Sequence, residues 1–159
     1  LCAKQARMLW FRQAQLFGCK SSEMTELDIN SLPDDRQPIM RIMPMPADTN
    51  ADGAIYGGWM MMQCDLAGSI EAQRCAQGAV NTVAVNAFQF HQPVYVGDLV
   101  SYYAERLRVG KTSVTVKVEV FAQRHPDLLQ CVKVTEAMLT YVAVGKDGKA
   151  REMPLDCGC

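Results

Sequence analysis

The chain has 159 residues, of which 49% are hydrophobic and 21% charged, and its formal net charge at pH 7 is -1. This length is enough for one domain with a substantial core, and the composition is that of a globular protein. A charge near zero without a large basic block argues against a nucleic-acid-binding protein. No apolar run approaches the roughly 20 residues that a membrane span requires, so we expect a cytoplasmic protein.

The residues that could bind a metal or form disulfides are seven cysteines and two histidines. The number of cysteines is odd, no CxxC pair occurs, and Cys64, Cys75 and Cys131 lie in apolar segments. We therefore expect buried free thiols and no metal site. His91 is expected to be a structural residue at a strand end, and His125 a solvated residue in a turn.

The N-terminal part of the chain differs from the rest. Its first 22 residues carry four Lys or Arg and no acid, and a polar segment follows at residues 25–38. A targeting helix, a disordered stretch and sequence foreign to the domain all fit this composition. We expect residues 1–36 to be an N-terminal extension and linker, residues 37–155 to be one folded domain, and residues 156–159 to be a tail.

One helix is predicted among five strands. At residues 57–76, Trp59, Met62, Leu66 and Ile70 recur at helical spacing, the small residues at 67–69 thin one side for close packing, and Gly78 is the expected C-cap. Alternating or β-branched patterns predict the strands at residues 37–43, 80–90, 98–109, 112–123 and 131–144.

The order of these elements, β-α-β-β-β-β, constrains the fold. Turn residues such as the Gly110-Lys111 pair separate consecutive strands and favour hairpins. An antiparallel sheet of this kind has only the one helix against which to bury its inner face. We therefore expect an α+β fold in which a five-stranded antiparallel sheet wraps around one long central helix.

The segment DTNADGAIYGGWMMMQCD, residues 48–65, carries the candidate chemistry. Gly57 and Gly58 would present backbone N–H groups at the start of the helix, where they can polarise a carbonyl and stabilise its oxyanion. Asp65 has apolar neighbours, and a helix buried by the sheet would leave it little water, so it could activate a water molecule or attack directly. A plain turn and a solvated aspartate are the alternatives.

The spacing of Gly57 and Asp65 has a consequence for assembly. Eight residues of helix separate them by about 12 Å, whereas an attacking group must come within about 3 to 3.5 Å of a carbonyl carbon. The two residues of one chain therefore cannot act on the same carbonyl. Antiparallel helices from two chains would bring Gly57 of one close to Asp65 of the other and create two identical sites, so we expect a homodimer.

Four motifs resemble the YciA-type acyl-CoA thioesterases of the hotdog superfamily. They are PADTNADGAIYGGWMMMQCD at residues 46–65, VGD at 96–98, GKTS at 110–113 and TEAMLTYVAV at 135–144. The resemblance covers about residues 37–155. It implies a hotdog fold, hydrolysis of acyl-CoA to a free acid and CoA, no cofactor apart from the CoA of substrate and product, and assembly as a dimer or a trimer of dimers.

The resemblance also assigns residues to roles. It places the catalytic acid on Asp65, the helix-start glycine on Gly57 with Gly58 beside it, and the loop asparagine on Asn50. Asn50, supplied by a different subunit from Asp65, would orient water or the thioester as a neutral hydrogen-bonding partner. Gln92 stands where an arginine is common in the family, and we assign it no role.

Residues around the Gly110 turn are candidates for binding the CoA nucleotide phosphates across a subunit interface, with a solvated hairpin as the alternative. These candidates are Arg106, Arg108, Gly110, Lys111, Thr112 and Ser113.

Two other functions remain alternatives. A non-catalytic acyl-CoA sensor would need an effector domain, and residues 1–36 are too short and irregular for one. A hotdog hydratase or dehydratase would need a histidine paired with an acid in the helix region, and no histidine stands there.

Overall fold

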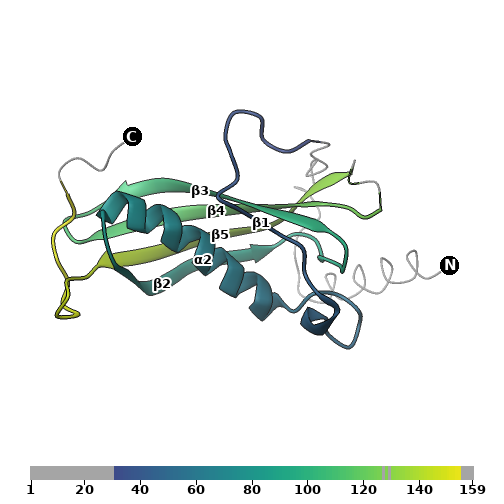
Figure 1. The fold of residues 1–159 in the computed structure, drawn as a ribbon, viewed down its shortest axis with the longest axis horizontal. Coiled ribbons are helices and arrows are strands. Elements are labelled where there is room, and N and C mark those ends of the chain that lie inside the picture. The colour runs from purple at the N-terminus through teal and green to yellow at the C-terminus, as the bar shows by residue number, and fades with distance from the viewer. Residues whose placement is uncertain (1–30, 127, 129, 155–159) are drawn as a thin grey trace, which may run out of the picture.

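The computed structural model describes residues 31–126, 128 and 130–154. In them, one long helix lies across one face of a five-stranded antiparallel sheet (Figure 1), whose strand order is β1-β3-β4-β5-β2. The elements are β1 Met40–Ile42, η1 Pro46–Asp48, α2 Gly57–Ala76, β2 Val80–Phe90, β3 Leu99–Val109, β4 Ser113–Gln123 and β5 Cys131–Ala143. The predicted α+β fold is confirmed, whereas residues 1–30 of the expected extension and the tail at 156–159 lie outside the described residues.

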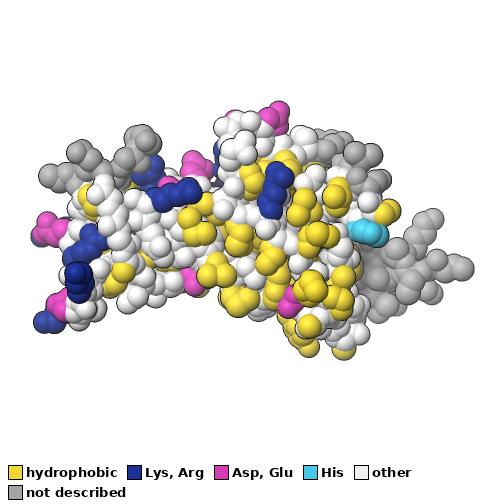
Figure 2. Space-filling view, viewed as in Figure 1, with side chains coloured by type: hydrophobic (Ala, Val, Ile, Leu, Met, Phe, Trp, Pro, Cys, Tyr) yellow, Lys and Arg dark blue, Asp and Glu magenta, His cyan; other side chains and the backbone are white. Residues whose placement is uncertain are grey.

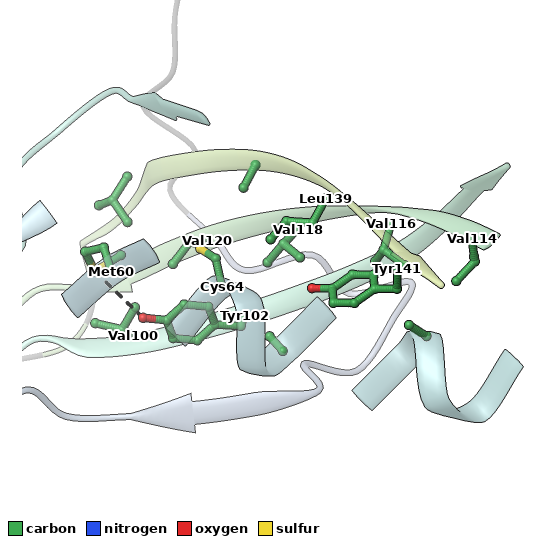
Figure 3. Close-up of a cluster of buried hydrophobic side chains, with 14 of the residues drawn as sticks. Met60, Cys64, Val100, Tyr102, Val114, Val116, Val118, Val120, Leu139 and Tyr141 are labelled. Carbon is green, nitrogen blue, oxygen red and sulfur yellow. Dashed lines mark hydrogen bonds between the residues drawn. The ribbon is translucent and has the colours of Figure 1, made fainter. Parts of the chain in front are cut away.

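The strands follow the predicted patterns closely. The first strand is shorter than the expected 37–43, and the 3-10 turn after it was not predicted. In β4 the valines at 114, 116, 118 and 120 are at most 1% exposed and point to the helix side, while the residues between them face the other side. Figure 3 shows these valines beside Tyr102 of β3 and Tyr141 of β5, in the layer between sheet and helix.

The face of α2 that packs on the sheet is lined by small residues. Ala67 and Ala72 are fully buried there, and Gly68 lies on the same buried face. Small side chains allow a close approach of helix and sheet, as expected for this part of the helix. Two of the larger residues that marked the helix in the sequence lie on its other side, where Met62 is 51% and Leu66 48% exposed, whereas Trp59 packs against the core. No helix in the described part of the chain is long and apolar enough to cross a membrane.

The C-terminal end of α2 differs from the prediction. The left-handed residue after the helix is Gln77, with φ of 50°, and not Gly78. The Arg151 guanidinium donates to the Ala76 carbonyl at 2.6 Å, and a Cβ at position 78 would lie 2.7 Å from the same guanidinium. Glycine at 78 therefore makes room for Arg151, which satisfies a carbonyl at the end of the helix.

The outer face of the sheet, away from α2, carries a charge network centred on Glu119. Its carboxylate lies 2.6 Å from both Arg36 and Lys133 and 3.3 Å from Lys117. Burial alone would raise the pKa of Glu119, but the hydrogen bonds from Lys133 and Arg36 and the nearby positive charges lower this pKa to about 2. The folded protein therefore keeps this carboxylate ionised at pH values where the unfolded chain protonates it.

We predict that this network makes stability fall in acid. An unfolded Glu119 takes up a proton near its ordinary pKa of 4.5, and the folded one only near 2, so the network's contribution of about 2 to 3 kcal/mol is lost as the pH falls through that window. Glu119→Gln should therefore be less stable than wild type at pH 7, and the difference should shrink between pH 4.5 and pH 2. Urea unfolding at a series of pH values measures this.

The matched control for this experiment is Glu105→Gln, because the Glu105 side chain is 59% exposed and 3.7 Å from Arg36. It should change stability little at any pH. An equal loss in both variants would contradict the assignment of the acid sensitivity to Glu119.

Candidate active site

The start of α2 is an open set of backbone donors. The helix begins at Gly57 with Tyr56 as its N-cap residue, and no side chain caps the first turn. The first N–H groups of a helix have no acceptor within it. A Cβ on Gly58 would meet nothing within 4 Å, whereas one on Gly57 would lie 3.2 Å from the Phe90 ring. A carbonyl oxygen can therefore approach these N–H groups closely on the side of Gly58.

Asn50 organises the loop that leads to the helix. Its Oδ1 accepts hydrogen bonds from the backbone N–H groups of Asp52 at 2.9 Å and Ala54 at 3.1 Å. Gly53, with φ of 80°, completes this turn. Within the described residues the Asn50 side chain uses only Oδ1, so its Nδ2 group can donate to a bound molecule.

Asp65 is half-buried, and one of its carboxylate oxygens is held by two strands. Oδ1 accepts a hydrogen bond from Thr82 of β2 at 2.7 Å and another from the Tyr141 hydroxyl of β5 at 3.3 Å. Tyr141 has one hydroxyl proton, which it shares between Oδ1 and the main-chain oxygen of Asp65, the latter at 3.0 Å. Among the described residues no donor reaches Oδ2. The sequence reasoning missed Thr82 and Tyr141; the one available signal was that a buried tyrosine needs a partner for its hydroxyl.

The expectation that the sheet would leave Asp65 little water is wrong for a single chain. The sheet contacts Asp65 from one side only, through Thr82 and Tyr141. On its other side the neighbouring side chains are 41% exposed at Met61, 51% at Met62 and 48% at Leu66. Gly58 lies seven residues before Asp65, which places both on this same side of the helix, about 10 Å apart along its axis. We call this side the open face of α2; Figure 2 shows hydrophobic side chains gathered over the first half of the helix.

The open face continues onto an edge strand of the sheet. β2 is the last strand of the sheet, so one of its edges has no partner among the described residues. Its side chains at Val83 and Val85 are 57% and 49% exposed, and none of its eleven residues is charged. A long, uncharged edge strand is a surface on which another strand can pair.

Three cysteines and one histidine have structural roles. Burial, and then the charge of Asp65, raise the pKa of the Cys64 thiol to about 12, so this residue is a core thiol and no nucleophile. Cys75 and Cys131 are also buried, as predicted. Burial, followed by the charge of Lys133, lowers the pKa of His91, whose backbone N–H pairs with β5.

The candidates around the Gly110 turn separate into two groups. Arg106 bonds Glu71 of α2 at 3.0 Å, Lys111 bonds Glu152 at 2.9 Å, and the Thr112 carbonyl accepts the N–H of Ala143. The structure thus engages these three residues in contacts within the chain.

The other three, Arg108, Gly110 and Ser113, line a hollow of about 330 Å³. Asn86, Thr115 and Thr140 complete its wall. Thr115 and Thr140 alternate with residues that face α2, so the hollow opens on the outer side of the sheet. Within one chain it is therefore separated from Gly58 and Asp65 by the sheet itself.

Gln92, to which the sequence assigned no role, lies 3.5 Å from the Arg124 guanidinium. Arg124 also forms an ion pair with Asp98, which in turn accepts the N–H of Tyr95 at 3.0 Å. These contacts tie the loop after β2 to the end of β4.

Comparison with known proteins places this geometry in a family. A family model described as "Thioesterase superfamily" matches residues 52–129. The acyl-CoA thioester hydrolase YciA of Salmonella typhimurium is 44% identical over 119 residues, which cover 74% of this chain and 90% of the relative.

Two solved structures show the same fold. A hexameric hotdog fold thioesterase of Campylobacter jejuni matches with a TM-score of 0.74 and 40% identity, over 79% of this chain and 96% of that one. An alanine variant of an acyl-CoA hydrolase from Staphylococcus aureus matches with a TM-score of 0.67 and 25% identity, over 72% of this chain and 70% of that one.

Proposed function

The chain belongs to the YciA-type acyl-CoA thioester hydrolases of the thioesterase superfamily, and on that basis we propose how its residues perform the reaction. It hydrolyses acyl-CoA to a free carboxylic acid and CoA. The observation that carries the proposed mechanism is that Gly58 and Asp65 share the open face of α2 but lie too far apart to act on one carbonyl. Each site therefore takes its helix start from one subunit and its aspartate from another.

In the proposed site the first-turn N–H groups at Gly57 and Gly58 donate to the thioester oxygen. Asp65 of the partner subunit then takes a proton from water as the water oxygen bonds to the acyl carbon, and the N–H groups hold the resulting oxyanion. Collapse of this intermediate breaks the carbon–sulfur bond, and the CoA sulfur leaves as the thiol with the proton that Asp65 had taken from water. Direct attack by Asp65, through an anhydride that water then hydrolyses, is the other route open to the same carboxylate.

Asn50 is proposed to position the water or the thioester through its Nδ2 group, while its Oδ1 keeps the loop in shape. One relative supports the pairing of Asn50 with Asp65. The S. aureus acyl-CoA hydrolase has been solved with one asparagine replaced by alanine and, in a second variant, with one aspartate replaced. Those two residues are fifteen apart, as are Asn50 and Asp65.

The proposed minimal unit is a homodimer that pairs the open faces of two α2 helices and the free edges of two β2 strands. Both surfaces are apolar and exposed in one chain, and two copies related by a twofold axis would cover them at once. The C. jejuni relative is hexameric, which supports a trimer of such dimers as the larger assembly.

We further propose that Arg108, Gly110 and Ser113 bind CoA phosphates. Arg108 is exposed and lines the hollow on the outer side of the sheet, so another subunit must bring the rest of the site to it. Arg106, Lys111 and Thr112 would then support the turn through their contacts within the chain. The buried free thiols of Cys64 and Cys131 fit the reducing cytoplasm that we propose as the location.

Loss of the Asp65 carboxylate should abolish turnover. We expect Asp65→Asn and Asp65→Ala to lower kcat by about 10² to 10⁴-fold, because general-base catalysis contributes about that much. Asn50→Ala should lower kcat less, since an amide donor only positions the reactants. Release of free thiol from a panel of acyl-CoAs measures this, and single turnover in labelled water shows whether the label enters Asp65.

Turnover by Asp65→Ala at the wild-type rate would refute the mechanism. No thiol release from any acyl-CoA by the wild-type chain would instead favour the sensor.

Mixing the two impaired variants tests whether the site is shared. In a hybrid of Asn50→Ala with Asp65→Ala, one site combines Asn50 of one chain with Asp65 of the other and is intact. After random mixing about half of the dimers are hybrids, and each hybrid has one intact site and one that lacks both residues. About a quarter of the wild-type activity should therefore return. If both residues of a site came from one chain, unfolding and refolding the mixture together would restore no activity.

Two neighbouring arginines should respond differently to replacement by alanine. Arg108→Ala should raise KM for acyl-CoA about tenfold, equivalent to about 1.4 kcal/mol, with unchanged stability. Arg106→Ala should instead lower the free energy of unfolding by about 1 to 2 kcal/mol, because it leaves the mostly buried Glu71 with only the longer and more exposed ion pair to Arg74. Steady-state kinetics and urea unfolding of both variants measure this. Unchanged KM in Arg108→Ala would remove the hollow from the proposed site.

A further inference from the structure

We propose that Tyr141 is a positioning residue for Asp65, and that Gly68 is the residue that allows it to reach the carboxylate. This inference rests on the proposed catalytic role of Asp65. It concerns how one carboxylate oxygen is held so that the other faces the substrate.

Two adjacent strands deliver donors to the same oxygen. Thr82 of β2 and Tyr141 of β5 are directly opposite each other in the strand register. The Thr82 hydroxyl lies 2.7 Å and the Tyr141 hydroxyl 3.3 Å from Oδ1 of Asp65. With Oδ1 held from both strands and Oδ2 without a donor among the described residues, the carboxylate has one fixed orientation, and Oδ2 is its reactive oxygen.

Tyr141 also fixes the backbone under the carboxylate. Its hydroxyl is 3.0 Å from the main-chain oxygen of Asp65, so one group contacts both ends of the residue. The tyrosine is fully buried between sheet and helix, where Figure 3 shows it beside the β4 valines. Burial, and then the negative charge of Asp65, raise the pKa of this phenol. The hydroxyl thus stays protonated and remains a donor.

Gly68 provides the space for this hydroxyl. A Cβ at position 68 would lie 2.3 Å from the Tyr141 hydroxyl oxygen and 3.1 Å from the ring carbon that carries it. Glycine is less favourable than alanine in a helix interior, and here the alanine methyl would occupy the place of the hydroxyl. The helix therefore lacks a side chain at position 68, about one turn after Asp65, and the Tyr141 hydroxyl uses that space.

A purely structural tyrosine would satisfy its hydroxyl and fill the core without affecting turnover. Tyr102 provides that comparison within the same layer. It is also fully buried, and its hydroxyl donates to the Met60 sulfur at 3.7 Å, as the dashed line in Figure 3 marks. Tyr102→Phe and Tyr141→Phe each remove one buried hydroxyl from the interface of sheet and helix, and only the second removes a donor to the catalytic carboxylate.

The test compares these two variants by steady-state kinetics and thermal unfolding. We expect Tyr141→Phe to lower kcat by about 10- to 100-fold, with KM within twofold of wild type, because a misplaced carboxylate impairs reaction more than binding. Tyr102→Phe should leave kcat unchanged at a similar loss in Tm. Wild-type kcat in Tyr141→Phe, or an equal fall in both variants, would overturn the inference.

A double variant tests the role of Gly68. Gly68→Ala should lower kcat to a similar extent by displacing the Tyr141 hydroxyl from Asp65. Adding Tyr141→Phe should cause little further loss, because the hydrogen bond that it removes is already broken in Gly68→Ala. Losses that multiply would show that the two positions act independently and would overturn the part assigned to Gly68. If Gly68→Ala does not fold, the comparison of the two tyrosines still decides the role of Tyr141.

The failure of this inference and that of the proposed function give different results. Full activity in Asp65→Ala removes the proposed function itself. An inactive Asp65→Ala together with a fully active Tyr141→Phe leaves the function in place and removes only the positioning role.

Discussion

The close packing of α2 on the sheet is the constraint on which the rest of the structure depends. A helix can approach a sheet this closely only where its side chains are small, and Ala67, Gly68 and Ala72 provide that face. Once this face is used for the core, the large residues Met62 and Leu66 must lie on the other side. The same packing brings the hydroxyl of Tyr141 within reach of Asp65. Core packing and site geometry are thus consequences of one contact.

That packing also explains why the candidate catalytic groups lie on the open face of α2. The start of α2 keeps its N–H groups uncapped, and Asp65 lies two turns further along the same side. Neither group alone can bind and hydrolyse a thioester. In the proposed dimer, a second copy in the opposite direction would supply what each lacks, and it would also cover apolar surface that a single chain leaves in water.

Much of the fold could be predicted because its signals are local. Alternating valines marked β4, and the helix bounds followed from apolar spacing and the glycine pair. The errors came from contacts distant in sequence. Arg151 occupies the space beside Gly78, and the left-handed residue is Gln77.

The site was predictable in part for the same reason. Asn50, Gly57, Gly58 and Asp65 lie within one segment of sixteen residues, where motif and spacing can be seen together. Tyr141 is 76 residues from Asp65, and only the register of β2 and β5 reveals that it belongs beside Thr82. Likewise, helical and strand patterns give no sign that Arg106 is held by Glu71 while Arg108 is left exposed.

The edge of β2 that has no partner among the described residues matters for solubility before the protein assembles. Its eleven residues contain no proline and no charge, the features with which proteins usually keep an edge strand from pairing with unrelated chains. In the proposed dimer, a newly made monomer would expose this edge as a template for aggregation until a second copy covered it. Pairing would then serve solubility as well as catalysis, because the exposed edge could otherwise pair with unrelated chains.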